Sequence, residues 1–242
     1  MRWSPIKNCM AFEMYSDSQI FQQVNEHFEK LLKERSALRI FLSELTKYGD
    51  TLLFGGAVRD ILSNKSPRDY DFVVTLRSCL LDRIVASYDF IRNRFGGYKF
   101  VLDGIKIDVW TLNNTWAFKN KLVSLAPENL TETVFLNIDS IAINLSRGDV
   151  YARRYKEAIE NNLLDIVLTA HPFPEVCVLR SLACKYKYNA RISSNLKEFI
   201  VKWKCSVDSP VDRLCNIQES GHGENLLNRD EIIRQLSDLC VF

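Results

Sequence analysis

Two aspartates separated by a single residue mark the stretch of this sequence best suited to do chemistry. Asp69 and Asp71 stand in residues 68–75, which the sequence predicts to be a β-strand, so their side chains leave the same face. A strand rises about 3.3 Å per residue, which places their Cα atoms roughly 7 Å apart. Carboxylates this close repel one another unless a cation lies between them. Oxygen ligands suit Mg²⁺ or Mn²⁺, which bind through a few carboxylates and substrate phosphates.

A third carboxylate is available in the predicted strand over residues 105–112. Strand alternation places Ile107 and Val109 on one face and Asp108 on the other. A neighbouring strand would bring Asp108 beside the first pair. Three carboxylates can hold two metal ions about 4 Å apart, the arrangement used for in-line displacement at phosphorus. We therefore predict a metal site formed by Asp69, Asp71 and Asp108.

Two adjacent glycines supply a second chemical feature. Gly55 and Gly56 lie between a predicted strand over residues 51–54 and a predicted short helix over residues 57–64. Without side chains, the backbone amides there can approach a phosphate, and the N-terminus of a helix favours an anion. Taken alone, the glycines are also explained by a tight turn, and the aspartate pair by a solvated strand edge. The joint pattern is far more specific than either part.

This ordered combination resembles the head domain of the poly(A) polymerase and CCA-adding enzyme family, within the polymerase-beta-like nucleotidyltransferase superfamily. The family reads Gly-Gly-x-x-Arg-Asp, then a short helix, then Asp-x-Asp, and residues 55–60 and 69–71 match it. The family's third carboxylate lies in a strand resembling Glu-Val-Ala-Thr-Phe-Arg. Residues 108–113 match this strand with Asp for Glu and without the terminal Arg. The resemblance covers residues 51–112 well and fades afterwards.

The resemblance implies transfer of a nucleoside monophosphate from an NTP to an acceptor hydroxyl, with release of pyrophosphate and with Mg²⁺ (or Mn²⁺) as cofactor. Asp69 and Asp71 would bind both metal ions. Asp108 would bind the catalytic one and help to deprotonate the acceptor. The expected catalytic and metal-binding residues are thus Asp69, Asp71 and Asp108, and the expected nucleotide-binding residues are Gly55, Gly56, Arg59, Arg68 and Arg180. For Arg59, bracing the glycine turn by a salt bridge is the alternative role.

Two later motifs of the family are degenerate. The motif resembling Arg-Arg-Asp-Phe-Thr-Ile-Asn-Ala retains only Asn144 in register. In the motif resembling Glu-Asp-x-x-Arg, which selects the base, Pro174 and Cys177 replace the Asp and the first Arg, and only Arg180 matches. Fewer than 40 residues follow residue 205, fewer than the tRNA-gripping body and tail of a CCA-adding enzyme would need. We therefore do not expect CCA addition.

The elements that must position these residues form an α+β chain: a polymerase-beta-like nucleotidyltransferase head with a mixed sheet and helices, followed by a small all-helical domain. Apolar residues at helical spacing predict either one long helix or two over residues 18–47, with Ser18 as N-cap and, for two helices, a break near Ser36. Asp103-Gly104 predicts a β-hairpin, and residues 134–145 read as a strand. The predicted domains are an N-terminal helical segment (1–50), the head (51–153) and a neck-like helical domain (154–242).

The composition of the 242 residues is that of a globular protein. Hydrophobic residues make up 47%, which excludes disorder or a collagen-like chain, and 32 basic against 30 acidic residues leave a net charge of only +2. No apolar run approaches the roughly 18 residues of a membrane span, and we expect neither a signal peptide nor a membrane partner. The seven cysteines are scattered without a CxxC pair, which predicts reduced thiols in a cytoplasmic protein.

Several functions remain open. The NTP is one expected partner, and an RNA 3′ end, of tRNA or another RNA, is the preferred acceptor over a protein hydroxyl or a small molecule. The chain could instead be a nucleotide- or RNA-binding module with weak or no turnover. A third reading is the toxin or defence component of a two-protein system, with a protein partner or a second copy of the chain.

Overall fold

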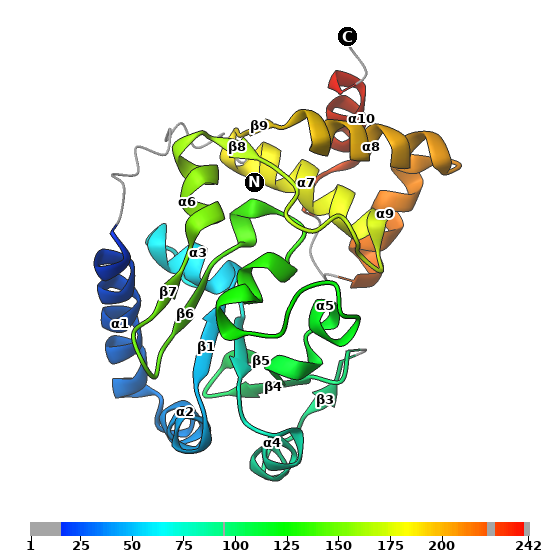
Figure 1. Cartoon of the computed structure of the whole chain (residues 1–242). Helices are drawn as coiled ribbons and strands as arrows, with labels where there is room; N and C mark the ends of the chain where they lie inside the picture. The colour runs from blue at the N-terminus through cyan, green and yellow to red at the C-terminus, as the bar shows by residue number, and fades with distance from the viewer. Residues whose placement is uncertain (1–15, 94, 222–225, 240–242) are drawn as a thin grey trace. The chain divides into compact units, whose positions relative to one another are not determined.

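The computed structural model describes residues 16–93, 95–221 and 226–239 (Figure 1). Among these residues two compact units are distinguished. Of the described residues, the first unit contains 16–134 and 138–156, and the second contains 135–137 and those between 157 and 239. The predicted α+β fold with a mixed sheet and helices is confirmed. The two helices of the predicted N-terminal segment belong to the first unit, with the sheet.

The first unit is built on a seven-stranded sheet in the order β3-β4-β5-β2-β1-β6-β7. Within it, β2 and β5 pair in parallel, whereas the other neighbours pair antiparallel. A parallel pair requires a long connection, which here includes α4 (Ser78–Val85) and the β3–β4 segment. The strands are β1 (Thr51–Phe54), β2 (Tyr70–Val74), β3 (Ile91–Arg92), β4 (Tyr98–Leu102), β5 (Ile105–Thr111), β6 (Ala142–Asn144) and β7 (Val150–Tyr151).

The predicted hairpin joins β4 to β5. Asp103 and Gly104 have φ angles of 49° and 78°, so both central residues of the turn occupy the left-handed region that this two-residue connection requires. The turn sets the register that places Lys99 of β4 opposite Asp108 of β5. The Asp103-Gly104 turn therefore determines that Lys99 faces Asp108 at the candidate site.

Helices α1 (Asp17–Glu34) and α2 (Ser36–Tyr48) cover one face of the sheet. The ring of Phe28 contacts that of Phe72 on β2, and the ring of Phe41 contacts that of Phe100 on β4. The predicted break near Ser36 is confirmed. The predicted N-cap, Ser18, is wrong, because the Ser16 side chain accepts from the Gln19 amide and the Gln19 side chain accepts from the Ser16 amide.

The opposite face of the sheet is covered by the chain that follows β5. It contains a 3₁₀ turn (Leu112–Asn114), α5 (Trp116–Lys119) and a second 3₁₀ segment (Pro127–Thr133). Side chains from both layers form a buried apolar cluster: Leu52, Val73, Leu112, Phe118, Leu130 and Ala142. Burial of this cluster holds the segment after β5 against the face of the sheet that carries Asp71 and Asp108.

The predicted strand over residues 134–145 is wrong over most of its length. Only Ala142–Asn144 is a strand, and Asn137–Asp139 forms a 3₁₀ turn. The Asn137 side chain donates to the Leu163 carbonyl and accepts from the Asp165 amide. These contacts with a distant part of the chain replace the strand pairing that the apolar pattern favoured.

The second unit is mostly helical. It contains α7 (Pro174–Tyr188), α8 (Ser194–Ser206), α9 (Pro210–Gly221) and α10 (Arg229–Asp238), with a small parallel pair, β8 (Leu163–Leu164) and β9 (Arg191–Ile192). Two further helices lie earlier: α3 (Gly56–Leu62), in the first unit, and α6 (Arg153–Glu160), which spans the boundary. Over the described ranges, every helix is too short or too polar to cross a membrane.

A histidine of α1 contacts the strand that carries the aspartates. His27 Nε2 lies 2.7 Å from the hydroxyl of Tyr70, the residue between Asp69 and Asp71. Burial lowers the pKa of His27 below its ordinary value of 6.5, and the charge of Lys30 adds to this effect. His27 therefore binds a proton less readily in the folded protein than in the unfolded chain.

We predict that the free energy of unfolding decreases as the pH falls below about 6.5, because only the unfolded state then binds the His27 proton freely. His27→Gln, which can still bond Tyr70, should reduce this pH dependence. Urea unfolding near neutral pH and about two pH units lower measures it. If the free energy of unfolding differs between the two pH values as much in the variant as in the unsubstituted protein, His27 does not cause the pH dependence.

Candidate active site

Four side chains form a row across the sheet at the candidate site. Asp71 on β2 is the register partner of Phe54 on β1 and of Asp108 on β5. Asp108 is in turn the partner of Lys99 on β4. Register partners share a face of the sheet, so the parallel pairing places the Asp71 and Asp108 carboxylates side by side. Asp69 directly precedes β2, and its charge acts on Asp108.

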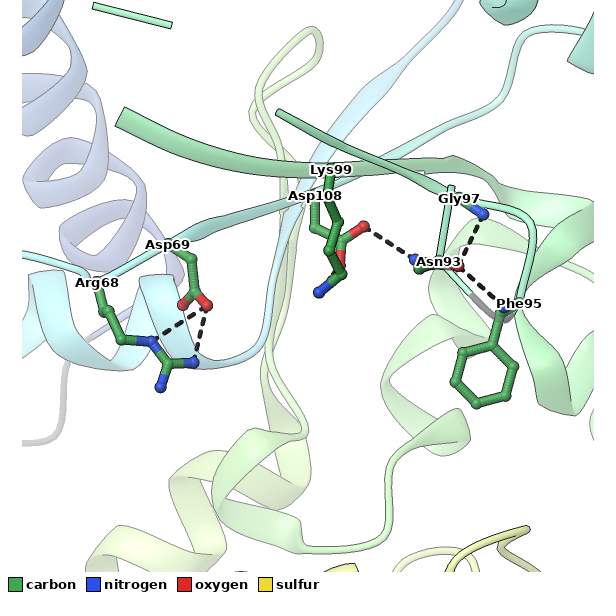
Figure 2. A network of polar contacts seen from close by, with 7 residues as sticks. All are labelled: Arg68, Asp69, Asn93, Phe95, Gly97, Lys99 and Asp108. Atoms are coloured by element: carbon green, nitrogen blue, oxygen red, sulfur yellow. Dashed lines mark hydrogen bonds and ion pairs between the residues drawn. The ribbon is translucent and has the colours of Figure 1, made fainter. Parts of the chain in front are cut away.

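Asp108 is an enclosed carboxylate held by two side chains. Its side chain is 15% exposed; Lys99 Nζ lies 2.8 Å from Oδ2, and Asn93 Nδ2 donates to Oδ1 at 3.1 Å (Figure 2). Burial raises the pKa of Asp108, and the negative charge of Asp69 adds to the rise, whereas Lys99 and Asn93 lower it. Without the Lys99 ammonium, ionisation of the buried Asp108 carboxyl would therefore be energetically unfavourable.

Asp69 is also paired with a cation of the protein. Arg68 Nη2 lies 2.8 Å from Asp69 Oδ2, and Arg68 Nε lies 3.3 Å from the same oxygen (Figure 2). The side chains are 51% and 40% exposed, so solvent screens this pair. Lys99 is likewise 56% exposed. The carboxylates of Asp69 and Asp108 are thus each paired with a long side chain that is partly exposed to solvent.

The donor set fits Mg²⁺ or Mn²⁺, but the side chains do not stand in a coordinating arrangement. In the described part of the chain, no three His, Cys, Asp or Glu side chains are grouped so that they could hold a metal ion. Asp71 and Asp108 supply oxygen donors on adjacent strands, and the charge of Asp69 acts on Asp108, so the metal site stays a prediction. Metal binding would require Lys99 and Arg68 to leave their carboxylates.

The glycine turn follows β1 at one end of the row. Gly55 has φ 66° and ψ −124°, a backbone conformation that glycine adopts readily and other residues do not. Its N–H donates to the Ile141 carbonyl at 2.8 Å and is therefore engaged. The amides that the turn can offer an anion are those at the start of α3, from Gly56 onward.

Arg59 braces this turn. Its guanidinium pairs with Asp139 and lies near Asp60, and its side chain is only 11% exposed. This is the salt bridge that the bracing alternative for Arg59 predicts. No role was predicted for Asp139 from the sequence, where it stands one residue before the position of the Asp in the degenerate motif over residues 138–145.

The other two predicted arginines are placed differently. Arg68 lies at the carboxylates and pairs with Asp69. Arg180 lies on α7, on an exposed position of the second unit. Seven of the eight predicted site residues thus lie in the first unit and Arg180 lies in the second, and the roles of all eight stay predictions.

A matched pair of substitutions tests the turn. Gly55→Ala should lower the free energy of unfolding by about 1–3 kcal/mol because its backbone conformation disfavours a side chain. Gly56→Ala should have a smaller effect, because Gly56 has no left-handed φ and an added Cβ requires only Arg59 Nη2, 3.3 Å away, to shift slightly. Urea unfolding measures both. Equal effects would show that the conformation of Gly55 is not what the turn requires.

The fold resembles that of solved tRNA nucleotidyltransferases. No protein-family model matches the sequence, and a search of curated proteins found no match. Similar structures are a CCA-adding enzyme with CTP (TM-score 0.60, 18% identity, covering 88% of this chain and 53% of that one) and the Thermotoga maritima CCA-adding enzyme complexed with tRNA (0.60, 18%, 87% and 53%). A tRNA nucleotidyltransferase complexed with a primer tRNA and an ATP analogue is a third (0.58, 20%, 79% and 57%). The chain spans about half the length of these proteins and has the nucleotidyltransferase fold found in them.

Proposed function

We propose that this protein is a metal-dependent nucleotidyltransferase, which moves a nucleoside monophosphate from an NTP to an acceptor hydroxyl and releases pyrophosphate. One observation carries the proposal: Asp71 and Asp108 are register partners on adjacent parallel strands. Asp69 directly precedes β2. A Gly-Gly turn follows β1, which lies next to β2 in the sheet. The similar structures, which include complexes with CTP and with tRNA, support the same chemistry.

The chain's own residues would divide the work as follows. Asp69, Asp71 and Asp108 would hold Mg²⁺, which supplies charge neutralisation at the phosphates when bound. Asp108 would accept the proton of the acceptor hydroxyl, a role that suits a carboxylate whose pKa burial has raised. The first amides of α3 would receive the triphosphate. Catalysis of this kind rests on positioning and electrostatics.

We propose an RNA 3′ end as the acceptor, without ordered CCA addition. The similar structures include complexes with tRNA. At the positions that match the family's base-selecting Asp and first Arg, this chain has Pro174 and Cys177. Cys177 is 2% exposed, and burial raises the pKa of its thiol to about 12, so it is neutral and enclosed. Neither residue offers the charged pairing that reads a base edge.

A second function is favoured by one specific observation. Lys99 and Arg68 already occupy the carboxylates of Asp108 and Asp69. A binding module that takes nucleotide or RNA without turnover would keep such pairs permanently. The two functions differ in whether a divalent cation displaces these side chains.

Charge-removing substitutions separate the two functions. Asp71→Asn and Asp108→Asn should each lower nucleotide transfer at least about a thousandfold, since metal-assisted charge stabilisation is worth several kcal/mol. The purified chain is incubated with each labelled NTP, Mg²⁺ and single-stranded RNA or total tRNA. Asp89→Asn, at an exposed aspartate, is the control and should retain activity. Full activity in the site variants would place the chemistry elsewhere, and no transfer by the unsubstituted protein would favour the binding module.

The base preference has its own test. With all four NTPs and tRNA lacking its 3′ CCA, we expect one kind of nucleotide, or several with weak preference, because the charged base-reading pair is missing. Sequencing of the tRNA 3′ ends measures the product. Ordered addition of two cytidines and one adenosine would show that the chain selects the base although Pro174 and Cys177 stand at the base-selecting positions.

A further inference from the structure

The two oxygens of the Asp108 carboxylate have partners of different kinds. Oδ1 accepts from Asn93 Nδ2 at 3.1 Å, and Oδ2 is paired with Lys99 Nζ at 2.8 Å (Figure 2). The amide of Asn93 is neutral, whereas the ammonium of Lys99 is a cation. A metal ion would therefore compete with Lys99 for the carboxylate and would not compete with Asn93.

The side chain of Asn93 is held in one orientation by the backbone. Its Oδ1 accepts from the Phe95 and Gly97 N–H groups, both at 2.9 Å, and its own N–H donates to the Gly97 carbonyl at 2.8 Å. An amide oxygen only accepts and an amide nitrogen only donates, so these contacts direct Nδ2 toward Asp108. Turning the amide over would set donors against donors and an oxygen against the carboxylate.

Gly97 allows Asn93 to approach the strand of Asp108. A Cβ at this position would lie 2.8 Å from Asn93 Nδ2, which is too short for a nonbonded contact. It would also lie 3.2 Å from both the Trp110 Cβ and the Val109 carbonyl oxygen, closer than side chains ordinarily pack. Val109 and Trp110 directly follow Asp108 on β5. The glycine therefore brings the backbone that holds Asn93 against β5.

Lys99 holds the other oxygen by a contact that solvent can replace. Its side chain is 56% exposed, against 15% for that of Asp108. The ammonium stands on a flexible four-carbon stem and can turn into water, where it is strongly hydrated. Lys99 can thus leave Asp108 more easily than Asn93, whose amide is tied to the backbone.

We infer that Asn93 is a positioning residue, which keeps Oδ1 of Asp108 engaged so that Oδ2 is the oxygen presented to a divalent cation. Lys99 occupies Oδ2 until the cation displaces it. The inference rests on the proposed function and describes how one of its carboxylates is oriented. Its consequence is that the two partners of one carboxylate act in opposite directions: removal of Asn93 weakens metal binding, whereas removal of the Lys99 charge does not.

The test measures Mn²⁺ binding without turnover. The full chain is titrated with Mn²⁺ alone, and free Mn²⁺ is followed by its electron paramagnetic resonance signal. Binding that is lost in Asp108→Asn identifies the site. Asn93→Ala and Asn93→Ser should each raise the dissociation constant at this site about 10–100-fold, the range typical of residues that orient a metal ligand.

Two comparisons separate positioning from a merely structural role. The hydroxyl in Asn93→Ser can still accept from the backbone N–H groups, although it is too short to reach Asp108, so it should not restore Mn²⁺ binding. Lys99→Met, which removes the competing charge, should lower the dissociation constant or leave it unchanged. Asn25→Ala is the control and should bind Mn²⁺ as the unsubstituted protein does, because Asn25 is exposed on α1 and donates to Glu29.

Three results would overturn the inference: no Mn²⁺ binding that depends on Asp108, a dissociation constant in Asn93→Ser equal to that of the control, or equal weakening in Lys99→Met and Asn93→Ser. Urea unfolding shows whether the Asn93 variants fold, and Lys99→Met, at an exposed position, tests the inference if they do not. Failure of the proposed function is seen separately, as absent nucleotide incorporation by a protein whose Mn²⁺ binding follows the expected pattern.

Discussion

The candidate site depends on the parallel pairing of β2 with β5, which sets two carboxylates side by side on one face of the sheet. Asp71 and Asp108 are partners in this register, and a shift by one residue would turn one of them to the opposite face. Two neighbouring carboxylates, with Asp69 close by, need positive charge. In this structure Lys99 and Arg68 provide it. The same charge requirement makes the site suited to a divalent cation.

The remainder of the first unit enforces this register. On one face, Tyr70 and Phe72 alternate with Asp71 and pack beneath α1, where Phe28 contacts both rings. On the other face, the apolar cluster that includes Val73 and Leu112 holds the segment after β5 in place. The β4–β5 turn at Asp103 fixes Lys99 opposite Asp108. A slip of either strand would expose these apolar side chains, so burial elsewhere maintains an arrangement that charge repulsion opposes.

Features with a local cause were predictable from the sequence, whereas those set by distant contacts were not. The alternation in β5 and the Asp103-Gly104 turn are local, and both were predicted correctly. The pairing of Arg59 with Asp139 joins residues 80 positions apart, and no local pattern indicates it. Most of the segment over residues 134–145 is not the predicted strand, because Asn137 bonds instead to the backbone of residues 163 and 165.

We propose that a divalent cation replaces Lys99 and Arg68 at the three aspartates. The decisive measurement is a crystal structure of the full chain with Mn²⁺ and a non-hydrolysable NTP analogue, with the metal located by anomalous scattering. We expect an anomalous peak at coordinating distance from Asp71 and Asp108, with the Lys99 ammonium no longer bonded to Asp108. Bound nucleotide without a metal peak there and with the Lys99–Asp108 pair intact would show that no cation replaces these side chains.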